Sequence, residues 1–530
     1  MSEVVQFFKG KTIFLTGATG TLGKLLIDHL LRKCEPKKLY LLIRNKNNVD
    51  PNNRAEKLFE EVIFERLRNE KPYIHETVKI LDGDLCENLL GIKEELFKEL
   101  TENVEIVIHG AATVRFDEPL RIATNINVKG TMSVIKLCQQ IKNLKAFSYI
   151  STAFSNYPYR DIKEELYDIH INCDQLMDLM TILNDNELNS LQSRILDKWC
   201  NTYVFTKAVA ENAIKMYAKD IPVAIVRPSI VIGTESEPIP GWSGNFSGAS
   251  RMVAASSLGI LRIAKMGPNC TAEMVPGDKV ANCILAATYK TGHLGAKTIL
   301  VYNMVTNRNN KVSYSEFTKI MCNASQTIPL ERIMWPPTLI MQPNAVVFEI
   351  LSLFLYLIPA FILTFVHTIR DDLQSIFWLY KNFRKLNNTI SYFTTKTWNF
   401  TYNNTVELWN DLGDEDRVLF NFDMISINWS NCITNFYKGI KKYLFKENME
   451  NINSALNRYE RLKYYQNTIW TYFYVYLIYI IFGTVWTESN YNYMIVKLTD
   501  IADVLQRIVG RKKSASADNH GNFSDWNCLG

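Results

Sequence analysis

A tyrosine and a lysine four positions apart, Tyr203 and Lys207, stand in the stretch NTYVFTKAVAE at residues 201–211. On a helix this spacing places both side chains on one face. A phenol has an ordinary pKa of about 10, and a neighbouring ammonium group helps it to donate a proton by stabilising the phenolate that forms. The same spacing also occurs at Tyr159/Lys163, Tyr392/Lys396, Tyr437/Lys441, Tyr459/Lys463 and Tyr493/Lys497. Whether this pair does chemistry therefore depends on what the chain builds around Tyr203.

Two hydroxyl side chains, Ser151 and Thr152, end the apolar stretch KAFSYIST at residues 145–152. A hydroxyl at the end of a strand can hold a substrate carbonyl oxygen while a hydride reaches the carbon. Neighbouring residues of an extended strand point to opposite sides, so we expect one of the two to face the site. We predict that Thr152 takes this role beside Tyr203 and Lys207, with Ser151 as the alternative.

A glycine turn near the N-terminus predicts a site for a dinucleotide cofactor. The stretch KTIFLTGATGTLGKLLIDHLLRK at residues 11–33 is typical of a strand, a turn and an amphipathic helix. The tight turn, the approach of a pyrophosphate and the packing of the helix each need a residue without Cβ. The N-terminus of the helix then offers N–H groups and a positive dipole end to phosphate. We predict cofactor contacts at Gly17, Thr19, Gly20, Thr21, Leu22 and Gly23, and Lys207 would also bind the cofactor ribose.

Two cations follow the second apolar stretch, KKLYLLIR at residues 37–44, which ends in Arg44 and has Lys46 close behind. Enzymes that bind NAD usually place an acid here to hold the ribose 2′-hydroxyl. Two cations would instead attract a 2′-phosphate. We therefore predict NADPH as the cofactor; the alternative is that Arg44 is only a solvated strand end.

Apolar stretches alternate with helical ones along the first half of the chain. Residues 77–85, 104–114, 145–152 and 223–233 are apolar runs that end in small or polar residues. Near-continuous apolar strands separated by helices predict an α/β fold with a Rossmann-type, doubly wound parallel sheet. Ligands of such sheets lie at the carboxyl ends of the strands. This extends the predicted cofactor site to Asp84, Leu85, Ala111, Ala112 and Pro228.

The composition excludes several classes of protein. A chain of 530 residues predicts two or three domains, and 47% hydrophobic with 21% charged residues is typical of a folded chain. A net charge of +5 is small for a protein whose main partner is nucleic acid. The 10 cysteines form no C-x-x-C pair, and H-E-x-x-H is absent, so neither a disulfide framework nor a metal site is predicted.

Several strings together resemble a known family. TGATGTLG, HGAAT, ISTA and Tyr-x-x-x-Lys resemble the extended short-chain dehydrogenase/reductases. Within them the chain is most similar to the alcohol-forming fatty acyl-CoA reductases, especially those of insects. The strings that carry this similarity are HGAATVRFDEPLRIATNINVKGT (109–131), YISTAFSN (149–156), VRPSIV (226–231), IPGWSGN (239–245) and FNFDMISINW (420–429).

The resemblance implies that NADPH reduces a long-chain fatty acyl-CoA to a primary alcohol with release of CoA, through a hemithioacetal and an aldehyde. It implies Thr152, Tyr203 and Lys207 as the catalytic set, with Tyr203 and Lys207 also contacting the cofactor. The chain departs from the family where Gly244 replaces a usual acid and where SGAS (247–250) and VPGD (275–278) replace the usual strings. These departures bear on the preference for chain length.

The resemblance and the apolar stretches together divide the chain. We expect an NADPH-binding reductase domain with a substrate-binding part at residues 8–310, a mainly helical C-terminal domain at 335–450, a hydrophobic transmembrane helix at 464–487 and a disordered tail at 511–530. The segment 464–487 is uncharged and rich in Tyr and Trp, which suit membrane interfaces; the alternative is a buried core helix. A second apolar run, 350–366, stays open between a membrane segment and a helix of a soluble domain.

These features predict an enzyme anchored to a membrane, with the endoplasmic reticulum as its location, the catalytic domain in the cytosol and the peroxisome as the alternative. The expected partners are a long-chain acyl-CoA substrate and membrane lipid, without nucleic acid, and a homo-oligomer stays open. Two other functions also stay open because a fold does not determine a function. One is another NADP-dependent extended short-chain reductase or epimerase that acts on a different lipid or small molecule. The other is a non-catalytic membrane scaffold of the same fold.

Overall fold

The part of the chain up to Met304 builds a seven-stranded sheet with the strand order β11-β7-β5-β4-β1-β2-β3. The computed structural model describes residues 2–46, 48–295, 298–357, 372–448 and 452–483. The strands of the sheet are β1 (Thr12–Thr16), β2 (Lys38–Ile43), β3 (Val78–Asp82), β4 (Ile106–His109), β5 (Ala146–Ile150), β7 (Val223–Pro228) and β11 (Ile299–Met304). Every neighbouring pair is parallel. The predicted Rossmann-type parallel sheet is confirmed, and its order reverses between β1 and β4, the point at which such sheets bind ligands.

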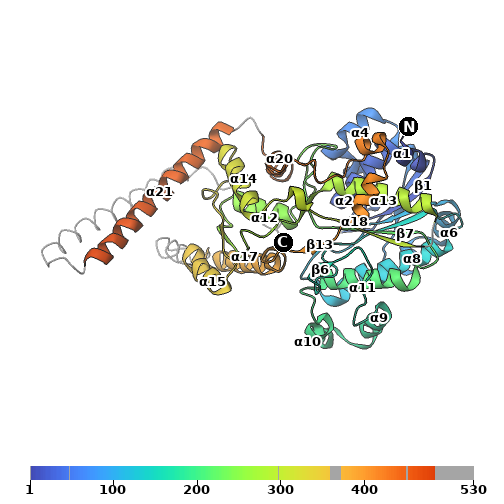
Figure 1. Cartoon of the computed structure of the whole chain (residues 1–530), viewed down its shortest axis with the longest axis horizontal. Helices are drawn as coiled ribbons and strands as arrows, with labels where there is room; N and C mark the ends of the chain where they lie inside the picture. Colours follow the sequence, from blue (N-terminus) through green and yellow to red (C-terminus); the bar gives the residue numbers. More distant parts are fainter. Residues whose placement is uncertain (1, 47, 296–297, 358–371, 449–451, 484–530) are drawn as a thin grey trace.

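Helices cover both faces of this sheet (Figure 1). On one face α2 (Thr21–His29) packs against α13 (Gly277–Leu294), which also contacts β5 and β7. On the other face α11 (Thr202–Tyr217) packs against α8 (Gly130–Gln140). Because both faces are covered, every residue of β1, β4, β5 and β7 is buried. This explains why these strands are mostly apolar and do not alternate regularly between apolar and polar residues.

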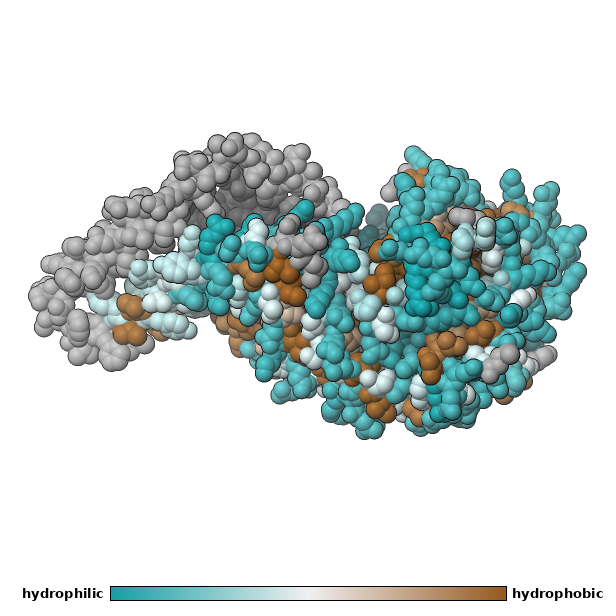
Figure 2. Space-filling model, turned by 90° about the horizontal axis from the view of Figure 1, so that it is seen from above, coloured by the Kyte–Doolittle hydropathy of each residue, from teal (hydrophilic) through white to brown (hydrophobic). Residues whose placement is uncertain are grey.

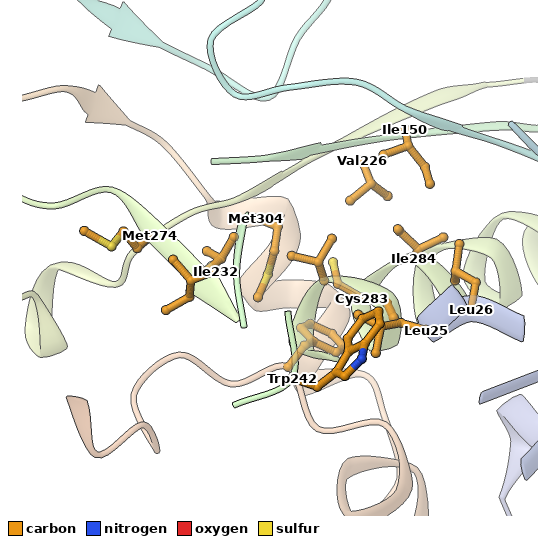
Figure 3. Close-up of a cluster of buried hydrophobic side chains, with 14 of the residues drawn as sticks. Leu25, Leu26, Ile150, Val226, Ile232, Trp242, Met274, Cys283, Ile284 and Met304 are labelled. Atoms are coloured by element: carbon orange, nitrogen blue, oxygen red, sulfur yellow. The ribbon is translucent and has the colours of Figure 1, made fainter. Parts of the chain in front are cut away.

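The core on the α2 and α13 side continues beyond the sheet. Figure 3 shows Leu25 of α2 and Cys283 of α13 beside Trp242, which comes from the IPGWSGN loop. This loop is fixed to α20 (Trp429–Gly439) by a close approach of two glycines. A Cβ on Gly439 would overlap the carbonyl of Gly241, and Gly241 itself has a φ of +75°, which favours glycine. The loop therefore joins the dinucleotide helix to the C-terminal helices.

A second, mainly helical part lies beside the sheet (Figure 1). It contains α12 (Gly248–Ser257), α14 (Tyr314–Thr327), α15 (Ala345–Ser352), α17 (Asp372–Thr394) and α20. The remaining helices of eight or more residues are α3 (Pro51–Glu60), α6 (Glu94–Asn103), α9 (Cys173–Ile182), α10 (Asp185–Leu196), α18 (Asn403–Asn410) and α21 (Ile452–Gly483). Short strand pairs join β10 (Met274–Pro276) to β8 (Ile230–Ile232), β12 (Ile340–Met341) to β9 (Ile263–Ala264) and β13 (Asn399–Phe400) to β6 (Asp161–Ile162).

The C-terminal helix α21 extends away from the body of the protein (Figure 1). Many of its aromatic and aliphatic side chains are exposed, and Figure 2 shows hydrophobic surface at this end of the molecule. A transmembrane helix was predicted at 464–487, but no helix among the described residues is long and apolar enough to cross a membrane. The prediction counted uncharged residues, whereas Tyr472, Tyr474 and Tyr476 bring polar hydroxyls into the middle of the segment. Residues 484–487, the end of the 350–366 run and the tail 511–530 lie outside the described residues.

Candidate active site

Tyr203 is the second residue of α11, a helix that is buried along most of its length. The side-chain oxygen of Asn201 accepts a hydrogen bond from the backbone N–H of Val204 at 3.0 Å and so caps the first turn. Burial raises the pKa of the Tyr203 phenol to about 12, and a hydrogen bond with Thr152 opposes this shift. The phenol therefore keeps its proton at neutral pH and lies beside the hydroxyl of Thr152. A protonated phenol in this position can donate its proton to a substrate oxygen.

Lys207 lies one turn further along α11 and is 2% exposed. Its Nζ donates a hydrogen bond to the carbonyl oxygen of Ile150 at 2.6 Å and lies 4.2 Å from the centroid of the Tyr149 ring. Burial lowers the pKa of Lys207 to about 7, and the negative charge of Glu211 opposes this shift. The ammonium group is therefore held by a carbonyl dipole and by an aromatic face, and both favour its charged form.

Ser151 and Thr152 point to different surroundings, as the alternation along an extended strand predicts. The hydroxyl of Ser151 donates to Oε1 of Glu211 at 2.5 Å, on the inner side of α11. Thr152 faces Tyr203, and its Oγ1 also accepts the backbone N–H of Phe154 at 3.3 Å. The structure thus places Thr152 next to the Tyr203 phenol and directs Ser151 to Glu211.

The glycine turn has the shape that a dinucleotide needs. Gly17 has a φ of +80°, and a Cβ there would lie 2.7 Å from the backbone nitrogen of Ala111. A Cβ on Gly23 would overlap the carbonyl of Gly17, so α2 can begin this close to the turn only without a side chain. Gly20 caps α2 without a side-chain hydrogen bond, and Thr19 and Gly20 are exposed, whereas Thr21 and Leu22 are half-buried. An exposed helix N-terminus next to a bare backbone fits a pyrophosphate.

A group of cations lies where β2 ends. Nη1 of Arg44 is 3.6 Å from Oδ2 of Asp84, whose Oδ1 accepts the backbone N–H of Cys86 at 2.9 Å. Arg54 of α3, which was not predicted from the sequence, donates a hydrogen bond to the carbonyl oxygen of Arg44. Burial, and then the charge of Arg44, lower the pKa of Arg54, so the two guanidinium groups lie close enough to repel each other. An anionic group between them would relieve this repulsion.

The remaining predicted cofactor residues lie at neighbouring strand ends. The backbone N–H of Ala111 donates to Oγ1 of Thr16 at 3.3 Å, and half-buried Ala112 follows it. Pro228 ends β7, and its carbonyl oxygen accepts the N–H of Ala153 at 2.9 Å. Leu85 is buried against Gly130 at the start of α8. All of these residues lie at the carboxyl edge of the sheet.

Two buried polar residues that were not predicted from the sequence form hydrogen bonds along this edge of the sheet. Asn127 lies in a π-helical turn, η4 (Asn125–Lys129); its Oδ1 accepts the N–H of Thr113 at 2.9 Å and its Nδ2 donates to Thr206 at 3.0 Å. His109 at the end of β4 lies 2.6 Å from Oγ1 of Thr16, and burial lowers its pKa to about 3. Asn127 thus ties the end of β4 to the catalytic helix, and neutral His109 ties β4 to β1. Both residues occur in the HGAAT…NINVKGT string, but the string does not show their partners.

A third missed feature is a buried ion pair below the catalytic residues. Oε2 of Glu211 lies 2.5 Å from Nη2 of Arg227, and Arg227 is completely buried. Two signals were available in the sequence. Glu211 continues the four-residue spacing of Tyr203 and Lys207, and Arg227 interrupts an apolar strand, where a charge requires a partner.

A cluster of aromatic side chains, here called the aromatic wall, lies beside Tyr203 and consists of Phe116, Phe154, Phe393 and Trp398. The ring of Phe116 lies 5.6 Å from that of Tyr203 and 5.5 Å from that of Phe393, which belongs to α17. Phe154 lies 4.9 Å from Phe393 and 5.3 Å from Trp398. A cavity of about 470 Å³ is lined by Phe116 and by residues of α10 and of the segment before Tyr203. The C-terminal helices therefore supply an apolar surface next to the proton donor.

The chain is similar to known proteins over most of its length. Two sequence models, both of the family described as Male sterility protein, match the chain: the NAD-binding model at residues 15–284 and the Sterile model at residues 355–447. The chain is 34% identical over 473 residues to Fatty acyl-CoA reductase wat of Drosophila melanogaster, which covers 89% of this chain and 92% of the relative. It is 33% identical over 474 residues to Fatty acyl-CoA reductase 1 of Homo sapiens, which covers 88% of this chain and 92% of the relative.

Solved structures of low identity share the fold. The terminal R domain of the myxalamid PKS-NRPS biosynthetic pathway superposes with a TM-score of 0.56 at 18% identity, covering 82% of this chain and 90% of that chain. The reductase (R) domain of a nonribosomal peptide synthetase from Mycobacterium tuberculosis gives a TM-score of 0.55 at 18% identity, covering 83% and 95%. These matches extend past the parallel sheet into the helical part.

The different surroundings of Thr152 and Ser151 generate a test. We expect Thr152→Val to lower kcat by about 100-fold or more, because it removes a hydroxyl that would stabilise charge on a carbonyl oxygen. Ser151→Ala is the matched comparison, and we expect a smaller loss, below about 10-fold, because its hydroxyl bonds Glu211 and supports the position of Thr152 without reaching the substrate. The measurement is the rate of nicotinamide oxidation at saturating substrate. A larger loss in Ser151→Ala than in Thr152→Val would reverse the assignment.

Proposed function

The chain belongs to the fatty acyl-CoA reductase family, and from this premise we propose that it uses NADPH to reduce a long-chain fatty acyl-CoA to the primary alcohol. The observation that carries the proposal is the Tyr203 phenol beside the Thr152 hydroxyl, with the buried Lys207 one helical turn further along α11, at the carboxyl edge of the sheet. This edge also carries the glycine turn. Proton donor, carbonyl clamp and dinucleotide turn are the parts that such a reduction requires.

The first half of the reaction converts the thioester into an aldehyde. The thioester carbonyl oxygen accepts hydrogen bonds from Thr152 and Tyr203, which polarise the carbonyl bond. The bound nicotinamide supplies the hydride. Tyr203 gives its proton to the carbonyl oxygen, which produces a hemithioacetal, and Lys207 stabilises the phenolate. The phenolate then takes back the hydroxyl proton as the C–S bond breaks, so that CoA leaves as a thiolate and Tyr203 is a phenol again.

The second half of the reaction uses the same groups on the aldehyde. Thr152 and Tyr203 hold the aldehyde oxygen, and Tyr203 protonates it as a second hydride arrives at the carbon. The phenolate then regains a proton from solvent, and a second solvent proton neutralises the CoA thiolate. The balance is two NADPH and two protons consumed for each acyl-CoA, with one alcohol and one CoA released.

The aromatic wall is the surface that we assign to the acyl chain. Phe116 lines the cavity of about 470 Å³, and its ring lies 5.5 Å from that of Phe393, which is buried together with Phe154. The three rings therefore form an apolar environment on one side of Tyr203. The wall begins at Tyr203 through Phe116. A substrate whose carbonyl is held by Tyr203 would therefore place its hydrocarbon part against this wall.

The test of the function is the stoichiometry of the purified full-length chain with acyl-CoAs of increasing length. We expect two NADPH oxidised for each acyl-CoA, a primary alcohol as the product identified by mass spectrometry, and at least a 100-fold loss of kcat in Tyr203→Phe. Aldehyde as the only product would rule out the second half of the reaction. No turnover with any acyl-CoA would favour another small-molecule reductase or a non-catalytic scaffold.

NADPH is the form of the cofactor that the cations after β2 favour. Arg44 and Arg54 lie next to each other, and the Asp84 carboxylate neutralises only part of their charge. The 2′-phosphate of NADPH would supply the missing negative charge through a bidentate contact with a guanidinium group.

Replacement of Arg44 by alanine tests this assignment. We expect Arg44→Ala to raise KM for NADPH by about 10-fold or more and to leave KM for NADH unchanged, because only NADPH carries the 2′-phosphate. Lys79→Ala is the control, since Lys79 is a cation on the neighbouring strand that is paired with Glu99 at 2.8 Å. Equal effects of Arg44→Ala on both cofactors would contradict the assignment.

For the location we propose attachment to a membrane, with the endoplasmic reticulum as the first choice and the peroxisome as the alternative. Trp470 and Phe473 of α21 are 40% and 48% exposed, and many of their neighbours are exposed aromatic or aliphatic residues. Aromatic residues of this kind favour the boundary between lipid and water. A long-chain acyl substrate also partitions into lipid, so an enzyme held there meets it at a high local concentration.

Flotation with phosphatidylcholine vesicles tests the membrane proposal. We expect the wild-type chain to float with the vesicles and Trp470→Glu/Phe473→Glu to lose about 10-fold in binding, since each charge must leave water with the helix. Val418→Glu is the control, because Val418 is 80% exposed on a different helix, α19 (Asp414–Leu419). Binding that is equally strong in all three proteins would show that α21 is not the attachment site.

A further inference from the structure

We propose that Glu211 is a positioning residue of this active site: its carboxylate fixes the loop that carries Thr152 and keeps Lys207 charged. This inference rests on the proposed function, because it concerns the residues that act in that reaction. Glu211 follows Lys207 by four residues on α11 and is 3% exposed. It lies below the catalytic pair, so it acts through other residues.

The carboxylate of Glu211 is bonded on both oxygens. Oε1 accepts hydrogen bonds from Ser151 at 2.5 Å, from Ser155 at 2.9 Å and from Nε of Arg227 at 3.0 Å. Oε2 accepts one from Nη2 of Arg227 at 2.5 Å. One side chain therefore joins helix α11, the loop after β5 and strand β7. A carboxylate has enough lone pairs for all four bonds, and a neutral side chain of the same size does not.

Stability alone does not explain this arrangement. A buried ion pair costs so much desolvation that apolar residues of similar volume stabilise a core equally well or better. Arg227 uses its other N–H groups to reach the carbonyl oxygens of Lys163 at 3.0 Å and Glu165 at 2.9 Å. The pair thus sets a geometry over three segments of the chain, which apolar contacts do not specify as sharply.

The first consequence is the position of Thr152. Ser151 precedes it, and Ser155 donates its backbone N–H to the carbonyl oxygen of Thr152 at 3.1 Å. Both serine hydroxyls are bonded to Glu211, so the segment 151–155 is fixed to the helix that also carries Tyr203. The separation of the Thr152 hydroxyl and the Tyr203 phenol, which must hold one substrate oxygen together, is therefore set by Glu211.

The second consequence is the charge of Lys207. The groups that face Lys207 are Glu211 on its own helix, His109 from β4, and Tyr149 and the Ile150 carbonyl from β5. Glu211 is the anion among these described neighbours, and its charge opposes the loss of the lysine proton. Replacing it by a neutral residue would also leave Arg227 as an unpaired cation nearby. Both changes lower the pKa of Lys207, so the charged lysine would be lost at a lower pH.

The experiment compares the full-length wild type with Glu211→Gln over a range of pH. We expect kcat to fall by about 10- to 100-fold in Glu211→Gln, because a small displacement of catalytic groups has this cost, with the Kd for NADPH within about threefold. At high pH, kcat falls as Lys207 loses its proton, and we expect this alkaline limb of the profile to move to lower pH in Glu211→Gln. The loss of kcat relative to the wild type should therefore be smaller at acidic pH. A merely structural role would not move this limb.

Glu447→Gln is the matched control, because the Lys441–Glu447 pair has side-chain exposures of 0% and 4%, as the Arg227–Glu211 pair has, and lies in the helical part. We expect it to lower stability without moving the pH limb. If Glu211→Gln does not fold, Ser151→Ala/Ser155→Ala replaces it: we expect kcat to fall by about 10-fold with the limb unmoved, since the charge stays.

The outcomes separate the two proposals. Absence of acyl-CoA turnover in the wild type would overturn the proposed function before any variant is compared. Wild-type turnover with an unchanged kcat and an unchanged pH limb in folded Glu211→Gln would overturn the positioning role alone. An equal shift of the limb in Glu447→Gln would also overturn it, because the effect would then not be specific to Glu211.

Discussion

The cost of burying one ammonium group governs the architecture of this site. Lys207 is buried on α11 against strand β5, where a charge without partners would lose its proton. The Ile150 carbonyl, the Tyr149 ring and the carboxylate of Glu211 each favour the charged form. These partners come from β5 and from α11 itself, so the charge persists only when helix and sheet are correctly packed. The charge of Lys207 therefore depends on the native packing of α11 against the sheet.

The cofactor side of the site depends on backbone segments that lie unusually close to one another. The turn at Gly17 touches the backbone of Ala111, and Gly23 touches the carbonyl of Gly17. The IPGWSGN loop adds a third approach, because a Cβ on Gly244 would lie 2.6 Å from Oγ1 of Thr21. This gives a physical reason for the departure of Gly244 from the acid that is usual in the family. In this chain the loop lies so near the dinucleotide turn that a side chain at residue 244 would have to displace Thr21.

The sequence predicted those parts of the site whose signals are local. The parallel sheet follows from apolar runs, the glycine turn from its spacing between strand and helix, and the Tyr203–Lys207 face from one helical turn. The missed residues depend on partners far along the chain. Asn127 meets Thr206, and Phe116 meets Phe393, only after the sheet and the C-terminal helices have assembled. Strand β11 was not predicted either, although ILVYNM at 299–304 is an apolar run similar to those of the other strands. The transmembrane helix predicted at 464–487 is not found among the described residues, because the tyrosines read as interface residues lie in the middle of the segment and lower its apolar character.

The boundary between the two parts of the chain does not coincide with the boundary of the site. A division near residue 310 separates the sheet from most of the C-terminal helices, but it does not separate the site. Phe393 and Trp398 complete the aromatic wall beside Tyr203, and Nζ of Lys385 lies 2.5 Å from Oδ2 of Asp117, next to Phe116. The pairing of β13 with β6 holds this segment against the sheet domain. The residues proposed for hydride transfer lie on the sheet and α11, whereas the aromatic wall that we assign to the acyl chain includes Phe393 and Trp398 of the C-terminal part. Under the proposed function, the preference for an apolar substrate would therefore depend on the assembled chain.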